Sequence, residues 1–193
     1  MAVEAVVFDV GETLVDETRM WEAAADAAGV PRFTLMGVLG GLAARGEDHQ
    51  RVWETLGVAP APPPSWEIDD FYSDALPCVR RLRESGYRVA AAGNMPESAE
   101  KFLREHVDAV GSSASWGVEK PASGFFARVV ELAGVEAEKI AYVGDRVDND
   151  IEPAFEADLV AVHVRRGPWG LLHDTPAVAI AVRSLDELPD VLP

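Results

Sequence analysis

Cysteine and basic residues are scarce in this chain of 193 residues. Its one cysteine, Cys78, excludes an intramolecular disulfide and a zinc site built from several thiolates. Seventeen lysines and arginines stand against 33 aspartates and glutamates, so the formal net charge is −16. Such an acidic surface repels nucleic acid and anionic lipid, and we therefore expect neither as a partner.

Long apolar runs are also missing. No stretch approaches the roughly 18 consecutive apolar residues that a membrane span needs. The N-terminus lacks a basic segment followed by an apolar one, the pattern of a secretory signal. We therefore expect a cytoplasmic protein that does not contact membranes. Apolar residues still make up 48% of the chain, which is enough for the core of one domain or of one domain carrying an insert.

Short apolar runs alternate with segments of helical periodicity over most of the chain. The runs at 3–9, 87–92, 140–143 and 159–164 predict buried strands, and weaker strands are expected at 109–112 and 178–182. Helices are predicted at 74–84, 97–105 and 123–132. This alternation is typical of an α/β fold with a doubly wound parallel sheet that helices cover on both faces.

The segment from 16 to 73 breaks the alternation. It predicts two or three helices, at 20–28, 33–44 and 48–56, followed by a stiff proline-rich run at 59–64. We interpret it as a small helical insert after the first strand. The predicted domains are then an α/β core, formed by residues 1–15 and 74–193, and the insert, residues 16–73.

In open parallel sheets, ligands bind beyond the carboxyl ends of the strands. Polar residues and glycines follow several of the predicted strands at this position. They are Asp9 after the first strand, Gly93 and Asn94 after the second, and Asp145 and Asp150 after the strand at 140–143, with Lys120 in a loop before a helix. Taken singly, an aspartate here could simply cap a turn or a helix. Together they favour a site, because carboxylates from two strands form the hard oxygen site that Mg²⁺ prefers.

Four short motifs, in this order, resemble the haloacid dehalogenase (HAD) superfamily of hydrolases. They are residues 8–14 (FDVGETL), 93–94 (GN), 117–121 (GVEKP) and 142–150 (YVGDRVDND). The resemblance covers the chain except the helical insert. It implies a HAD-like Rossmannoid core, and the insert would correspond to a small helical cap of the C1 type.

The resemblance also implies a function for the motif residues. Asp9 would be the nucleophile that attacks phosphorus and forms an aspartyl-phosphate. Asp9, the backbone carbonyl of Gly11 and Asp145 would hold Mg²⁺, with Asp150 nearby. Lys120 and the metal would neutralise the phosphoryl oxygens. The expected activity is Mg²⁺-dependent hydrolysis of a small phosphorylated metabolite.

Two motif positions depart from the phosphatases of this superfamily. Gly11 stands where those enzymes have a second aspartate that protonates the leaving group, a contribution typically worth ~10²–10⁴-fold in rate. Gly93 replaces a threonine or serine that binds the phosphate, so a backbone N–H of Gly93 or Asn94 would bind it together with Lys120. Glu12, beside the missing aspartate, is a candidate substitute for the acid, although a surface role for it is favoured.

These departures leave two alternatives to a phosphatase of low activity. The chain could be a catalytically impaired domain that binds a phosphorylated ligand or a protein partner. It could also be a 2-haloacid dehalogenase, since those enzymes lack the second aspartate too, although they do not need the metal site that Asp145 and Asp150 predict. Nothing in the residue pattern indicates an oligomeric state.

Overall fold

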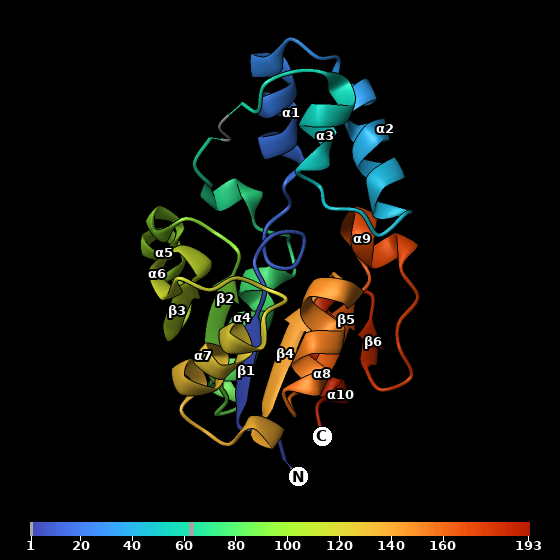
Figure 1. Ribbon diagram of the computed structural model, residues 1–193. Coiled ribbons are helices and arrows are strands. Elements are labelled where there is room, and N and C mark those ends of the chain that lie inside the picture. Colours follow the sequence, from blue (N-terminus) through green and yellow to red (C-terminus); the bar gives the residue numbers. More distant parts are fainter. Residues whose placement is uncertain (1, 62–63) are drawn as a thin grey trace.

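A computed structural model describes residues 2–61 and 64–193 (Figure 1). Six parallel strands form one sheet in the order β3-β2-β1-β4-β5-β6. The strands are β1 (Ala5–Phe8), β2 (Arg88–Gly93), β3 (Ala109–Ser112), β4 (Ile140–Gly144), β5 (Val160–Val164) and β6 (Ile180–Val182). The predicted α/β fold with a doubly wound parallel sheet is confirmed, including the two weaker strands, β3 and β6.

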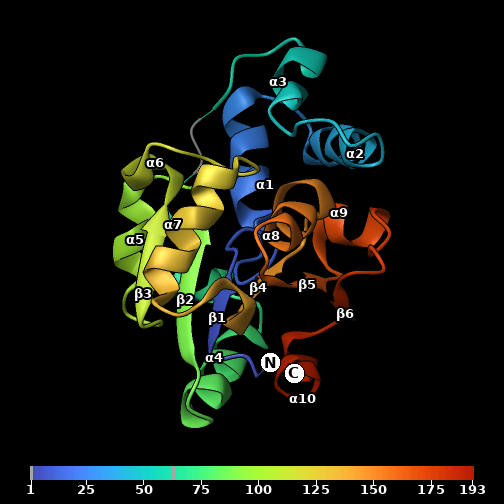
Figure 2. The ribbon, with the colours of Figure 1, turned by 60° about the horizontal axis from the view of Figure 1, so that its bottom comes forward.

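Helices cover both faces of the sheet (Figure 2). They are α4 (Ala75–Glu84), α5 (Glu97–Leu103), α6 (Ser113–Trp116), α7 (Ser123–Ala133), α8 (Glu152–Glu156), α9 (Gly167–Leu172) and α10 (Leu188–Val191). Side chains alternate between the two faces of a strand. Val6 and Phe8 of β1 therefore share a core with α4, α5 and α10, whereas Ala5 and Val7 share one with α7 and α8.

Three helices lie beyond the carboxyl ends of the strands (Figure 1). They are α1 (Thr18–Ala28), α2 (Arg32–Ala43) and α3 (Arg51–Leu56), close to the three segments expected from the sequence. Leu35, Leu39 and Trp53 belong to their common core, which Trp169 of α9 joins from the sheet side. Of the proline-rich run expected at 59–64, residues 62 and 63 lie outside the described residues.

Two adjacent chain segments connect these helices to the sheet. Residues 14–16 lead away from β1, and residues 70–72 return toward α4. The backbone N–H of Tyr72 donates to the carbonyl of Leu14 (2.9 Å), and that of Asp16 donates to the carbonyl of Asp70 (2.8 Å). The Asp70 carboxylate accepts from Arg19 Nε at 2.7 Å. These bonds fix the start of α1 close to the end of β1.

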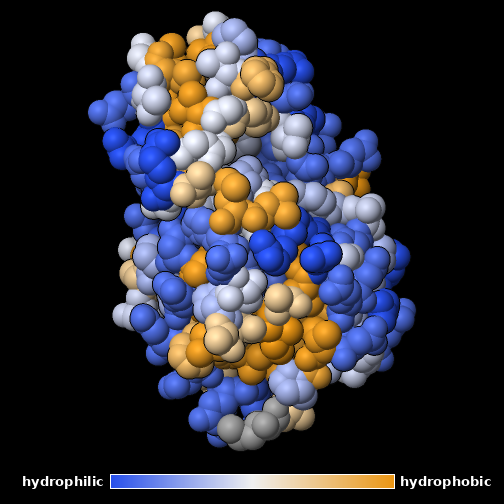
Figure 3. All heavy atoms as spheres, turned by 90° about the vertical axis from the view of Figure 1, so that its right-hand side faces the viewer, coloured by the Kyte–Doolittle hydropathy of each residue, from blue (hydrophilic) through white to orange (hydrophobic). Residues whose placement is uncertain are grey.

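The side of the molecule that carries α9 and β6 shows apolar patches among hydrophilic residues (Figure 3). Leu171 and Leu172 of α9 are exposed, as is Val178, which precedes β6. Within residues 2–61 and 64–193, no helix combines the length and apolar character needed to cross a membrane. The residues expected to carry chemistry lie elsewhere, at the carboxyl ends of the strands.

Candidate active site

The strand order reverses at β1, which lies between β2 and β4, and Asp9 directly follows β1. Phe8 pairs with Val143 in the sheet, and the backbone N–H of Asp9 donates to the carbonyl of Val143 at 2.8 Å. This register brings Asp9 to the level of Gly144 and Asp145 at the end of β4. The position is the crevice in which open α/β sheets bind ligands.

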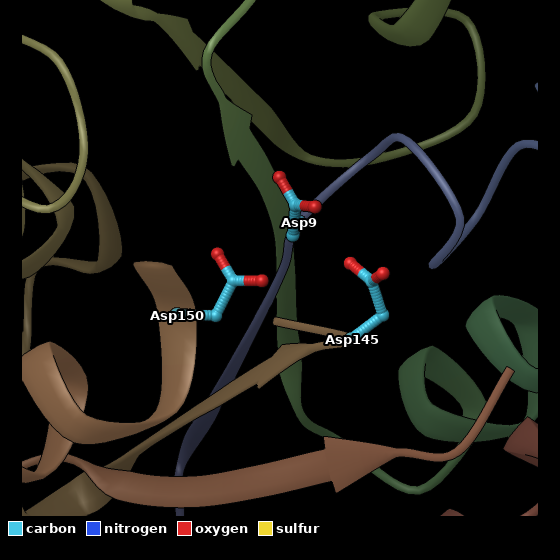
Figure 4. Close-up of side chains that lie close together, drawn as sticks. All are labelled: Asp9, Asp145 and Asp150. Carbon is cyan, nitrogen blue, oxygen red and sulfur yellow. The ribbon is translucent and has the colours of Figure 1, made fainter. Parts of the chain in front are cut away.

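Three aspartates meet at this point (Figure 4). Asp9, Asp145 and Asp150 are buried, and each contributes one carboxylate oxygen to a group whose members lie within 4.8 Å of one another. Asp150 belongs to a π-helical turn, Val147–Ile151, which folds back over the end of β4. A β-carbon on Gly144 would lie 2.5 Å from the β-carbon of Asp150, so the glycine permits this close approach.

Lys120 joins the aspartates from the loop before α7. Its Nζ lies 2.6 Å from Oδ1 of Asp9 and 2.6 Å from Oδ1 of Asp150. Asn94 holds the lysine in place: its Oδ1 accepts from the backbone N–H of Lys120 (2.8 Å), and its Nδ2 donates to the carbonyl of Lys120 (3.1 Å). The Asn94 side chain thus positions Lys120, a use that its place at the end of β2 did not predict.

A contact to the backbone carbonyl of Asp145 fixes the position of this residue. His163 of β5 lies with Nε2 3.0 Å from the carbonyl oxygen of Asp145 and with Nδ1 2.7 Å from Oγ1 of Thr175. The imidazole is buried. Through these two contacts it connects the loop after β4 with the loop that precedes β6. These contacts fix the backbone of Asp145 and leave its carboxylate directed at the site.

The charges of this cluster do not balance. Three carboxylates and one ammonium group give a formal net charge of −2 when all four are ionised, and the described residues donate no hydrogen bond to the carboxylate of Asp145. Burial, followed by the charge of Asp150, raises the pKa of Asp145 well above its ordinary value. Burial also raises the pKa of Asp9, to about 6, despite the opposing effect of Lys120. An oxygen-rich site with excess negative charge could bind a divalent cation, and its ligand type suits Mg²⁺.

Lys120 remains a cation in this environment. Burial alone would lower the pKa of its ammonium group, but the carboxylates of Asp150 and Asp9 raise it well above its ordinary value. The rings of Phe125 and Tyr142 lie 5.9 and 5.8 Å from Nζ and enclose the charge. The lysine therefore presents a fixed positive charge beside Asp9.

Both carboxylate oxygens of Glu12 accept hydrogen bonds. Its Oε1 accepts from the backbone N–H of Glu17 (3.0 Å), and its Oε2 accepts from the hydroxyl of Tyr72 (2.6 Å). Burial raises the pKa of its carboxyl group. Both oxygens thus bind the segments that connect the sheet with the helices above it.

The two glycines at the departing motif positions are close to carboxyl groups. A β-carbon on Gly93 would lie 2.8 Å from Oδ1 of Asp9, so a larger residue there would crowd the aspartate. A β-carbon on Gly11 would lie 2.6 Å from Oε1 of Glu17, which directly precedes α1. Burial, followed by the charge of Glu12, raises the pKa of Glu17 to about 7. No motif marks Glu17, because only the folded connection of residues 14–16 brings it here.

The site opens into a cavity of about 800 Å³ beneath the three helices. Besides Asp9, Asp145 and Lys120, its walls include Trp21, His49, Arg146 and Trp169. The guanidinium carbon of Arg146 lies 5.1 Å from the centre of the Trp169 ring. A neighbouring cavity of about 700 Å³ shares Trp21 and His49 with the first and extends between further aromatic side chains. A small molecule would contact both the strand ends and the helices.

Comparison with known proteins places the chain in a family. A sequence model described as haloacid dehalogenase-like hydrolase matches residues 3–158. The chain belongs to this family of hydrolases. The superfamily to which the four motifs pointed is thereby confirmed.

Two curated relatives of this HAD-like hydrolase are glyceraldehyde 3-phosphate phosphatases. The protein from Methanopyrus kandleri is 36% identical over 104 residues, which are 51% of this chain and 45% of the relative. That from Methanocaldococcus jannaschii is 31% identical over 127 residues, which are 63% of this chain and 56% of the relative. The alignments thus span about half the length of these relatives.

Solved structures share the fold over the whole chain. A putative HAD-hydrolase from Bacillus subtilis, crystallised with magnesium, has a TM-score of 0.73 and 16% identity, and the match covers 100% of this chain and 99% of that one. At this identity the likeness concerns the fold. It extends to the helices that lie above the strand ends, because both chains are covered almost completely.

Proposed function

We propose that this HAD-like hydrolase is a magnesium-dependent phosphatase of small phosphorylated metabolites. The observation that carries the proposal is the buried pairing of Asp9 with Lys120 beside the free carboxylate of Asp145. This arrangement combines a nucleophilic oxygen, a fixed cation and ligands for a second cation at the end of one cavity. The phosphatase names of the two curated relatives support the same reaction class.

Asp9 would act as the nucleophile. Its Oδ1 accepts from Nζ of Lys120, and its Oδ2 is the oxygen proposed to attack phosphorus. The attack forms an aspartyl-phosphate and releases the alcohol. Water then hydrolyses this acyl phosphate, which releases inorganic phosphate and regenerates Asp9. Lys120 lies close enough to Asp9 to neutralise a phosphoryl oxygen in both steps.

Three groups would hold the metal: the carboxylates of Asp9 and Asp145 and the backbone carbonyl of Gly11, with Asp150 nearby. The net charge of −2 fits this assignment, since a divalent cation would compensate it. When bound, Mg²⁺ would neutralise charge on the transferring phosphoryl group. The backbone N–H groups of Gly93 and Asn94 are proposed to donate to the phosphate, because the Asn94 side chain is already bonded to Lys120.

Residues 16–73 are proposed to act as a C1-type cap over a core of residues 1–15 and 74–193. The cap contributes Trp21 and His49 to the cavity walls, so these side chains would contact the alcohol part of a substrate. In this proposal the chain lacks the second catalytic aspartate of related phosphatases, because Gly11 takes its position.

The first test is the hydrolysis of p-nitrophenyl phosphate, whose leaving group needs little protonation. We expect activity with Mg²⁺, and none after EDTA treatment or in the Asp9→Asn variant. Asp69→Asn is the matched control, because Asp69 is exposed and does not line the cavity. A panel of phosphate esters that includes glyceraldehyde 3-phosphate would then identify the substrate class.

Two results would overturn the proposal. Hydrolysis that persists in Asp9→Asn would exclude Asp9 as the nucleophile. Binding of phosphate esters without turnover of any of them, p-nitrophenyl phosphate included, would instead favour a binding domain.

A further inference from the structure

A carboxyl group from the cap fills the space beside Gly11. A β-carbon built on Gly11 would lie 2.6 Å from Oε1 and 2.9 Å from the carboxyl carbon of Glu17. The glycine and the glutamate are therefore complementary, since a side chain at residue 11 would displace the Glu17 carboxyl group. The resemblance to HAD phosphatases puts the missing acid at this position. We propose that Glu17 replaces it and donates the proton to the leaving group, an inference that rests on the proposed phosphatase function.

The carboxyl group of Glu17 is held in place by its neighbours. Its backbone N–H donates to Oε1 of Glu12 (3.0 Å), and its Oε2 accepts from Nε1 of Trp21 at 3.3 Å. The described residues provide no hydrogen-bond donor for Oε1, the oxygen beside Gly11. Glu17 also lines the cavity that contains Asp9 and Lys120. One oxygen is thus fixed, and the other is available to a substrate.

Other acidic residues near Gly11 are already engaged. Glu12 uses both oxygens, one for the backbone N–H of Glu17 and one for the hydroxyl of Tyr72. Asp16 accepts from the backbone N–H of Thr18 at 2.8 Å and, unlike Glu17, does not line the cavity that contains Asp9. Glu12 therefore acts as a positioning residue for Glu17, and Glu17 is the carboxyl group left for proton transfer.

The proton balance of the reaction is complete with Glu17. As Asp9 attacks phosphorus, the bond from phosphorus to the ester oxygen breaks, and that oxygen takes the electron pair and the proton of Glu17. In the second step the Glu17 carboxylate removes a proton from water as its oxygen attacks phosphorus. The bond from phosphorus to Asp9 breaks, and inorganic phosphate leaves. Glu17 is then protonated again, and the sum is an ester plus water giving an alcohol plus phosphate.

The test compares two leaving groups in the Glu17→Gln variant. An alkyl phosphate needs a proton on its leaving oxygen, whereas p-nitrophenolate is stable without one. We expect kcat/KM for the alkyl phosphate to fall ~10²–10⁴-fold, with a much smaller loss for p-nitrophenyl phosphate. Glu54→Gln is the control, because Glu54 is an exposed glutamate of the cap outside both cavity linings. An equal loss with both substrates, or no loss, would overturn the role of Glu17.

A second pair of variants tests whether a carboxyl group at residue 11 can replace the carboxyl group of Glu17. Gly11→Asp alone should impair the enzyme, because the new side chain collides with Glu17. Gly11→Asp combined with Glu17→Ala should recover alkyl phosphate hydrolysis relative to Glu17→Ala alone, and failure to recover it would contradict the inference.

The controls separate this inference from the proposed function. Activity that depends on Asp9, together with an unchanged ratio between the two leaving groups in Glu17→Gln, would refute the inference alone. Activity that survives in Asp9→Asn would refute the phosphatase mechanism and the inference with it.

Discussion

Replacement of Asp9 by asparagine should stabilise the metal-free protein while it abolishes activity. Burial raises the pKa of Asp9 from its ordinary value of 3.8 to about 6, so ionisation of this carboxyl group in the folded protein costs free energy. Since one pKa unit corresponds to ~1.4 kcal/mol, the cost above pH 7 is about 3 kcal/mol. Asparagine has nearly the same shape and carries no charge. The variant should therefore exceed the wild type in unfolding free energy by about 3 kcal/mol.

The sign of the pH dependence follows from proton binding. Between pH 4 and 6 the folded state holds the Asp9 proton more tightly than the unfolded state, so the contribution of Asp9 to the unfolding free energy falls as the pH rises through this range. The advantage of Asp9→Asn should accordingly be small below pH 4, roughly half of its maximum at pH 5 and complete above pH 7. Taking the difference between variant and wild type removes the contribution of the other carboxylates.

Urea unfolding in EDTA at a series of pH values measures this difference, and Asp69→Asn serves as the control that should show none. Saturating Mg²⁺ should reduce or reverse the advantage, because the wild type gains the binding free energy of the metal and the variant loses a ligand. A difference that stays constant between pH 4 and 7 would refute the reasoning, since it would mean that Asp9 ionises in the folded protein as it does in the unfolded chain.

Two further predictions concern the metal and the fold. Mg²⁺ at a hundred times its Kd should stabilise the protein by about 2.7 kcal/mol, and Asp145→Asn should lose most of this gain in thermal unfolding; an equal shift in the variant would place the ion elsewhere. Asp74→Ala should cost about 3–5 kcal/mol in urea unfolding, because it removes the partner of the buried Arg166 guanidinium, whose Nη1 and Nη2 lie 2.9 and 2.5 Å from the carboxylate. A loss below 1 kcal/mol would show that this ion pair contributes little.

The strands could be predicted because they are buried on both faces. Val6 and Val7 point to opposite sides of the sheet, yet both are fully buried, so β1 appears in the sequence as a continuous apolar run. The helices α6, α9 and α10 were not predicted, because four to six residues are too short to display a helical period. Their positions depend on the elements against which they pack.

The candidate site was predictable only where a residue directly follows a strand or belongs to a motif. Asp9 and Asp145 could be placed together because parallel strands end at one edge of the sheet. Glu17 carries no such mark, since it reaches Gly11 through the paired segments 14–16 and 70–72. The two hydrogen bonds from Asn94 to the backbone of Lys120 likewise join loops 26 residues apart. Such contacts arise from tertiary structure and cannot be derived from local pattern.

The proposed roles divide the reaction between two parts of the fold. Asp9 directly follows β1 and Lys120 lies in the loop before α7, whereas Glu17 precedes α1 in the proposed cap. The Glu17 carboxyl group lies beside Gly11, with Oε1 2.6 Å from the position that a β-carbon there would take. The proton donor would thus come from the segment that leads into α1, while the nucleophile and the fixed cation come from the α/β core.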